Sequence, residues 1–368
     1  MRSFNLSTVL ATLSLPLLAA AETSLTTSNP QYTLTDNLTY DNFFSAFDFF
    51  SEPDPTHGFV RYQTLSSAIS QQLIGYMPDT RSVYLGVDST SKEADSTGRA
   101  SVRLESKKSW NHGLLIADIR HMPASQCGVW PAFWLVSASK TWPEGGEIDI
   151  LEGVNDDESS KITLHTSSGC TVDNSSVVTG NGSDGAITSP FSGTMLTSDC
   201  DVNAEGQSKN MGCSIQAPYQ GGDAQLVAGN TDPELPSYGT SFNSVSGGVY
   251  AMEWTADDIA VWLFPRDSDG FNKFFPHTNE TMKEPDPAAW GPPLARFGGK
   301  ECDFEQRFKD LRVVFNTAFC GDWAGREWDK SCREKTGVET CEEYVRDHPE
   351  AFSEAYWDIS GLWWWQKK

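Results

Sequence analysis

Hydrophobic residues recur at alternate positions in short runs along the chain, which is the period-2 pattern of half-buried strands. Turn residues separate these runs, and long stretches of helical periodicity are missing. The pattern predicts strands at 82–87, 100–104, 113–119, 148–151, 161–165, 249–254, 259–264 and 312–315. Helices are expected to be few, with 305–308 and 341–346 as the best candidates. Short strands joined by turns are typical of an antiparallel sandwich or barrel.

One domain, at about residues 26–366, is expected because neither an internal repeat nor a long linker divides the chain. The stretch 172–248 is rich in Gly, Ser, Asn and Asp and predicts a long ordered loop excursion. Residues 1–21 have the features of a secretory signal peptide: Arg2, an apolar run at 9–18 and a small-residue cleavage site. The apolar run is too short to span a bilayer, and a buried N-terminal helix is the alternative.

Other features agree with export. The predicted mature part contains an even set of cysteines suited to disulfides, although their pairing cannot be deduced. These are Cys127, Cys170, Cys200, Cys213, Cys302, Cys320, Cys332 and Cys341. Their spacing matches no zinc site, so neither a metal nor another cofactor is expected. Glycosylation sequons begin at Asn37, Asn174, Asn181 and Asn279. The chain ends in Trp363–Lys368 without a hydrophobic tail, so a membrane anchor is not expected. With the signal peptide, the cysteines and the sequons, we expect a secreted, extracellular protein, and we expect it to be a monomer.

The charge of the chain excludes polyanionic partners. Fifty acidic side chains stand against 27 basic ones, giving a formal net charge of −23. Nucleic acids and anionic membranes require a basic face, so neither is an expected partner. With 38% hydrophobic residues the chain can still form a core, and its 13 tryptophans are unusual.

Candidate chemistry lies in the acidic run Glu147-Ile148-Asp149-Ile150-Leu151-Glu152. Strand alternation places Glu147 and Asp149 on one face, whereas Glu152 would point the other way. One extra residue, a β-bulge at Ile150-Leu151, returns Glu152 to the shared face. The two Glu carboxylates could then lie about 5–5.5 Å apart, as in retaining glycosidases. Three crowded carboxyls should also leave one protonated near neutral pH.

This spacing alone is a weak signal, because an acidic solvated strand would show it too. Against that alternative, the aliphatic residues of the run need a core behind the strand. Aromatic residues lie just upstream, in Trp130–Trp134 and at Trp142. Alternation puts Trp130, Ala132 and Trp134 on one face and Phe133 on the other. Indole rings on the acidic face could stack on the flat C–H faces of sugars.

The acidic run resembles the signature of family 16 glycoside hydrolases in its bulged, laminarinase-type form. The resemblance covers nearly the whole mature chain and is closest to fungal secreted endo-1,3(4)-β-glucanases. It includes the segments 54–58, 98–103, 127–134, 253–255 and 319–325. It implies an all-β jelly roll of two packed antiparallel sheets with a concave substrate cleft. An acidic insert at 156–158 and a tail of three tryptophans depart from the pattern.

The resemblance also implies roles for single residues. Glu147 matches the nucleophile, Glu152 the acid/base, and Asp149 the aspartate that tunes the nucleophile. Trp134, Trp142, His165 and Trp254 match substrate-binding positions, with a core histidine as the alternative for His165. A retaining endo-β-glucanase acting on 1,3- and mixed 1,3/1,4-β-glucans is therefore expected. A cell-wall transglycosylase with a sugar acceptor and a non-catalytic glucan-recognition protein are the alternatives.

Overall fold

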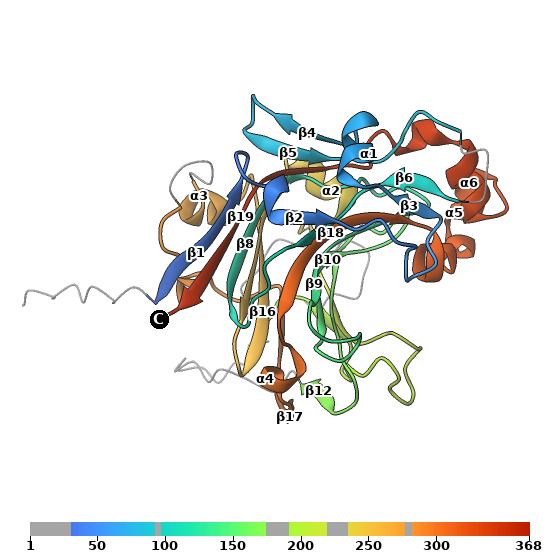
Figure 1. The fold of residues 1–368 in the computed structure, drawn as a ribbon. Coiled ribbons are helices and arrows are strands. Elements are labelled where there is room, and N and C mark those ends of the chain that lie inside the picture. The colour runs from blue at the N-terminus through green and yellow to red at the C-terminus, as the bar shows by residue number, and fades with distance from the viewer. Residues whose placement is uncertain (1–30, 93–96, 174–190, 219–234, 277–281) are drawn as a thin grey trace, which may run out of the picture.

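Two large antiparallel sheets pack face to face in this computed structural model, which describes residues 31–92, 97–173, 191–218, 235–276 and 282–368. Figure 1 shows the two layers, with the short helices at their edges and ends. The predicted signal peptide and the sequons at Asn174, Asn181 and Asn279 lie outside these residues. Asn37, the remaining sequon, is exposed on the first strand.

Among the described residues, one sheet has nine strands and the other has eight. The nine-stranded sheet runs β12 (Cys170–Asp173), β17 (Ala295–Cys302), β16 (Asp258–Pro265), β15 (Gly248–Trp254), β8 (Gly113–His121), β19 (Trp357–Lys367), β5 (Ser82–Leu85) and β4 (Ile74–Met77), with β1 (Tyr32–Thr39) also paired to β19. The eight-stranded sheet runs β13 (Thr194–Thr197), β14 (Cys213–Gln216), β11 (Lys161–His165), β10 (Glu147–Glu152), β9 (Val129–Ser137), β18 (Leu311–Phe319), β7 (Arg103–Ser106) and β2 (Phe47–Phe49). A short parallel pair joins β3 (Val60–Tyr62) to β6 (Arg99–Ser101). The predicted all-β jelly-roll sandwich is confirmed.

Helices are short, as expected. They are α1 (Leu65–Ser70), α2 (Gly239–Ser244), α3 (Asp269–Phe274), α4 (Phe304–Arg307), α5 (Cys332–Thr336), α6 (Cys341–Asp347), a π-helical turn η3 (Gly321–Gly325) and the 3-10 turns η1 (Phe44–Ala46), η2 (Pro287–Ala289), η4 (Trp328–Lys330) and η5 (Pro349–Phe352). The two expected helices correspond to α4 and α6. In the part of the chain that the structure describes, no helix is long and apolar enough to cross a membrane.

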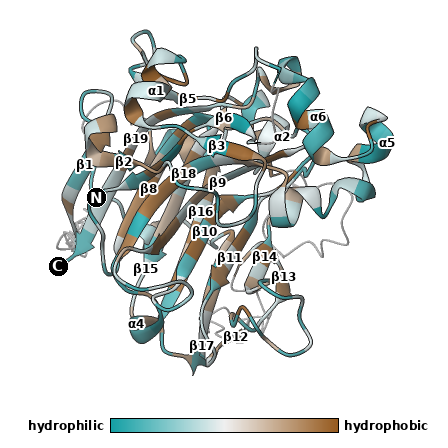
Figure 2. Cartoon of the chain, turned by 45° about the vertical axis from the view of Figure 1, so that its right-hand side comes forward, coloured by the Kyte–Doolittle hydropathy of each residue, from teal (hydrophilic) through white to brown (hydrophobic). Residues whose placement is uncertain are grey.

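The main core fills the space between the sheets. Alternate residues of facing strands meet there, for example Leu115 of β8, Phe133 of β9 and Ile148 of β10, each at most 2% exposed. Figure 2 shows the hydrophobic colour concentrated along the strands, while α5 and α6 are mostly hydrophilic. Strand alternation thus gives the eight-stranded sheet one face toward the core and an opposite face that can carry polar side chains.

Two segments of the chain form regular structure that the sequence pattern did not predict. The tryptophan tail is part of β19, which pairs with β8. Trp364 points into the inter-sheet core and stacks on Trp110, whereas Trp363 and Trp365 pack on the other face of the sheet. The expectation that 172–248 is a loop was wrong, because this stretch supplies the edge strand β13, its neighbour β14 and helix α2. Those two strands are only four residues long, which is too short for alternation to reveal them.

Four disulfides join the eight cysteines and leave none free: Cys127–Cys332, Cys170–Cys302, Cys200–Cys213 and Cys320–Cys341. The first and last of these tie the start of β9 and the end of β18 to α5 and α6. A second apolar cluster, which includes Val129, Phe319 and Val345, fills the space beneath these helices. The C-terminal helices are therefore fixed beside one end of the eight-stranded sheet (Figure 1).

Candidate active site

The predicted bulge is present in β10. Opposite β9, Asp149 pairs with Trp134 and Leu151 with Phe133, so Ile150 has no partner. The pairing with β11 also shifts between Asp149 and Glu152. Ile150 and Leu151 are both at most 1% exposed in the core. The extra residue therefore lets two adjacent aliphatic side chains enter the core and returns Glu152 to the face of Glu147 and Asp149.

Two glycines set the start of this strand. Gly145 and Gly146 have φ values of 116° and 79°, a backbone conformation that residues with a side chain rarely adopt. A Cβ on Gly146 would lie 2.6 Å from the carbonyl oxygen of Arg307, and one on Gly145 would lie 2.4 Å from Ser137 Oγ. Only glycine allows the loop to enter β10 so close to its neighbours, which fixes the position of Glu147.

The three carboxyl groups lie on the face of the eight-stranded sheet that is turned away from the core, here called the polar face. Asp149 is 2% exposed, and the side chain of Glu147 is 16% exposed. His165, which pairs with Glu147 on β11, places Nε2 3.3 Å from Asp149 Oδ2 and 3.9 Å from Glu147 Oε1. The histidine thus belongs to the carboxyl cluster and is not an isolated core residue.

Burial controls the protonation of the cluster. It raises the pKa of Glu147 to about 8 and the pKa of Glu152 to about 8, with a further increase in both from Asp149. Burial also raises the pKa of Asp149 well above its usual value. His165 opposes the shift at both glutamates. Because each negative charge disfavours the next, the cluster retains protons near neutral pH, as the sequence predicted.

Trp130 holds Glu152 from the neighbouring strand. Its Nε1 donates a hydrogen bond to Glu152 Oε1 at 2.9 Å, and its ring meets Trp323 edge to face with centroids 5.6 Å apart. Lys161 Nζ lies 4.8 Å from the centroid of Trp323 and pairs with Asp157 Oδ2 at 2.9 Å. Two half-buried indoles and a lysine therefore surround the Glu152 end of the cluster.

Trp134 is fixed by a second network. Its Nε1 donates to Asn316 Oδ1 at 2.8 Å, and Asn316 Nδ2 donates to the Tyr62 hydroxyl at 3.0 Å. The Arg103 guanidinium lies 5.0 Å from the centroid of Trp134 and pairs with Glu105 Oε1 at 2.8 Å. The ring is thus held in one orientation beside the carboxyls, which suits it to stack on a flat ligand.

The other aromatic candidates lie apart from this network. Trp142 is 42% exposed in the connection from β9 to β10. Trp254 was assigned wrongly: it lies on β15 of the other sheet, is 0% exposed and packs in the inter-sheet core. Its assignment to the cleft rested on the family resemblance alone, which does not show to which sheet the strand belongs. Sequence reasoning also missed the contacts of Arg103, Asn316 and Trp323, which depend on strand register.

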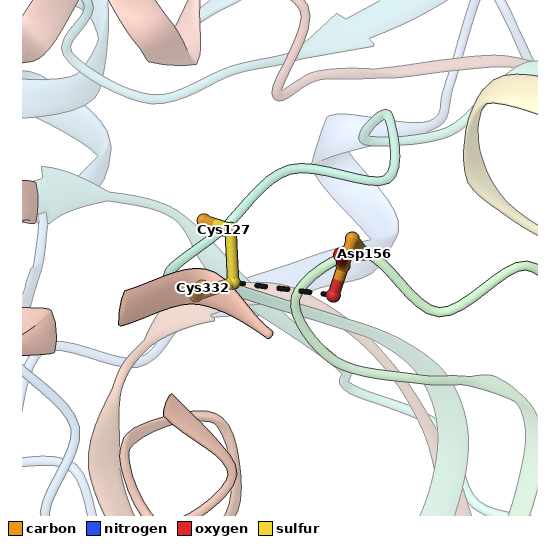
Figure 3. Close-up of side chains that lie close together, drawn as sticks. All are labelled: Cys127, Asp156 and Cys332. Atoms are coloured by element: carbon orange, nitrogen blue, oxygen red, sulfur yellow. Dashed lines mark hydrogen bonds between the residues drawn. A yellow bond between two sulfur atoms is a disulfide. The ribbon is translucent and has the colours of Figure 1, made fainter. Parts of the chain in front are cut away.

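Among the residues that the structure describes, two clusters have the donor atoms for a metal ion. Those of Glu147, Asp149 and His165 lie within 4.8 Å of one another, but carboxyls that retain their protons are poor cation ligands. In the other cluster, Asp156 Oδ1 lies 4.0 Å from Cys332 Sγ (Figure 3). Both sulfurs there form the Cys127–Cys332 disulfide, so neither is a thiolate. Instead, Asp156 accepts a hydrogen bond from Ser331 Oγ at 2.6 Å.

A family model described as "XgeA-like, catalytic GH16 domain" matches residues 47–364. The chain belongs to glycoside hydrolase family 16. An endo-1,3(4)-beta-glucanase of Arthroderma benhamiae is 42% identical over 331 residues, covering 89% of this chain and 64% of that protein. This family 16 chain thus spans less than two thirds of the length of that relative.

Two solved family 16 structures are similar over 91% of this chain and 100% of theirs. One is an elongating β-1,3-glucosyltransferase, 38% identical with a TM-score of 0.74. The other is Laminarinase 16A of Phanerochaete chrysosporium, holding β-glucans in both donor and acceptor sites, 34% identical with a TM-score of 0.74. The expected membership in family 16 is therefore confirmed over most of the chain.

Proposed function

We propose that this chain is a retaining endo-β-glucanase that cleaves 1,3- and mixed 1,3/1,4-β-glucans. The observation that carries the proposal is the bulged strand β10, which places Glu147, Asp149 and Glu152 together on one face between Trp130 and Trp134. Carboxyl groups supply the nucleophile and proton donor of glycoside hydrolysis, and indoles stack on sugars. The endo-1,3(4)-beta-glucanase relative supports this substrate class.

In the first step, Glu147 attacks the anomeric carbon while Glu152 gives its proton to the leaving oxygen, producing a glycosyl-enzyme. Glu152 then removes a proton from the incoming water, which releases the sugar with its original anomeric configuration. Asp149 and His165 lie against Glu147 and act on its pKa in opposite directions, because Asp149 raises it and His165 lowers it. Since the cluster disfavours two negative charges together, an ionised Glu147 favours a protonated Glu152, as the first step requires.

Transfer to a sugar acceptor is the second candidate. A similar structure is an elongating glucosyltransferase, and the chemistry is shared up to the glycosyl-enzyme. The two candidates differ only in whether water or a sugar hydroxyl resolves that intermediate. We further propose that residues 26–366 form one catalytic domain, secreted as a monomer after removal of residues 1–21. The four disulfides support export, because such bonds persist in oxidising compartments.

Product analysis on laminarin, lichenan and a plain 1,4-β-glucan tests the proposal. Shorter oligosaccharides from laminarin and lichenan, but not from the 1,4-glucan, are expected. Products longer than the starting oligosaccharide would favour the glucosyltransferase. Binding of laminarin without any new product would contradict both enzymes and favour a recognition protein.

A further inference from the structure

Asn155 follows Glu152 by three residues and is nearly buried, with 4% of its surface exposed. Its φ of 56° is left-handed, a conformation that asparagine tolerates better than most residues. Its side-chain Oδ1 accepts a hydrogen bond from the Gly128 N–H at 2.8 Å, and its Nδ2 donates to the Ala324 carbonyl at 2.9 Å. Its own N–H donates to the Val129 carbonyl at 2.9 Å. One residue therefore joins the end of β10 to two other segments.

Each of those segments carries an indole of the candidate site. Gly128 and Val129 directly precede Trp130, whose Nε1 bonds the Glu152 carboxyl. Ala324 directly follows Trp323, whose ring meets Trp130 edge to face. Both indoles lie at the Glu152 end, which is where the leaving sugar or incoming acceptor must lie if Glu152 exchanges protons with it. The hydrogen bonds of Asn155 thus fix the backbone next to Trp130 and next to Trp323, and these two indoles surround the Glu152 carboxyl.

We propose that Asn155 is a positioning residue for Glu152 and for the leaving-group side of the site. It acts by fixing the backbone that aims Trp130 and Trp323, not by touching substrate. Small misplacements of a catalytic group reduce rates by about 100-fold per Å, so a loosened Trp130 should slow proton transfer by Glu152. The proposal rests on the proposed function and adds to it a residue outside the catalytic run.

The test compares Asn155→Gly with Asn243→Ala. Glycine keeps the left-handed backbone accessible and removes both side-chain bonds. Asn243, on α2, makes a matching pair with the backbone of Met122, accepting from its N–H at 3.0 Å and donating to its carbonyl at 2.8 Å. Two rates are measured for each variant: kcat on laminarin, and the pre-steady-state burst on a dinitrophenyl β-laminaribioside, whose leaving group needs no proton.

Asn155→Gly is expected to lower kcat on laminarin by about tenfold or more while changing the burst rate by about twofold or less. Asn243→Ala should leave both rates near wild type. Asn155→Asp, which keeps the acceptor for Gly128 but loses the donor for Ala324, should show the same split more weakly. Equal losses in both rates, the same split in Asn243→Ala, or failure of both Asn155 variants to fold would overturn the proposal. A wild-type protein inactive on laminarin would instead overturn the proposed function.

Discussion

The register of β10 is the feature on which the candidate site most depends, and changing its length by one residue tests this. Deleting Leu151 leaves Glu-Ile-Asp-Ile-Glu, in which plain alternation keeps both glutamates on the polar face. Inserting one Ala after Ile150 gives Glu-Ile-Asp-Ile-Ala-Leu-Glu, in which plain alternation also keeps Glu152 on the polar face, but two strand steps, about 6.6 Å, further from Glu147 than in the bulged strand. Neither variant needs a bulge, so the two differ in how far apart the glutamates lie along the strand.

The expected changes in stability and activity follow from the burial of Leu151 and from the spacing of the two glutamates. The deletion removes one fully buried leucine side chain, a loss of about 2–5 kcal/mol in the free energy of unfolding. A domain stable by about 5–15 kcal/mol should survive this loss. The insertion buries no carboxyl, but it moves Glu152 along the strand and should break its 2.9 Å bond from Trp130. The deletion should fold and keep some activity, whereas the insertion should fold but be inactive, because its two carboxyls lie too far apart to act on one glycosidic bond.

The assay is hydrolysis of a 1,3-β-glucan beside a thermal melt of each variant. Replacing Leu151 with Ala is the matched control, because it removes most of the same side chain without changing register. The control and the deletion should lose similar stability. A folded, active insertion variant together with an inactive deletion variant would refute the register argument.

Three further predictions follow from the site and the disulfides. Glu147→Ala should lose the glycosylation step, and added azide should give a product with inverted anomeric configuration. If azide instead restores activity with retained configuration, the assignment of Glu147 as the nucleophile is contradicted. Because the folded pKa of Glu152 is raised to about 8, folding favours its protonated form, so stability should fall as pH rises from about 4.5 to about 8. Glu152→Gln should then melt above wild type at pH 8 with little difference at pH 4, and equal gaps in melting temperature at both pH values would argue against this. Replacing Cys127 and Cys332 by Ser should lower the melting temperature more than replacing Cys200 and Cys213. The first pair is separated by 205 residues and the second by 13, and a longer loop costs more entropy to close. The reverse order in thermal melts would count against the loop-entropy explanation.

Sequence pattern predicted the parts of the fold that depend on local alternation. The bulge in β10 could be deduced because Ile148, Ile150 and Leu151 need a core and the acidic residues do not. The burial of Trp254 between the sheets could not be predicted, because alternation gives the direction of a side chain but not the sheet to which its strand belongs. Disulfide pairing and the bond from Trp130 to Glu152 also depend on how distant strands align. Strands β13 and β14 could not be predicted because four residues are too few to show a reliable period.

The anomeric form of the first product tests the central claim most directly. Proton NMR can follow laminarin cleavage from its first minutes, before mutarotation mixes the anomers. A covalent intermediate on Glu147 predicts that the newly formed reducing end appears first as the β-anomer, with the α-anomer growing in later. Initial appearance of the α-anomer would mean a single inverting displacement, and would contradict the assignment of Glu147 and Glu152 as nucleophile and acid/base.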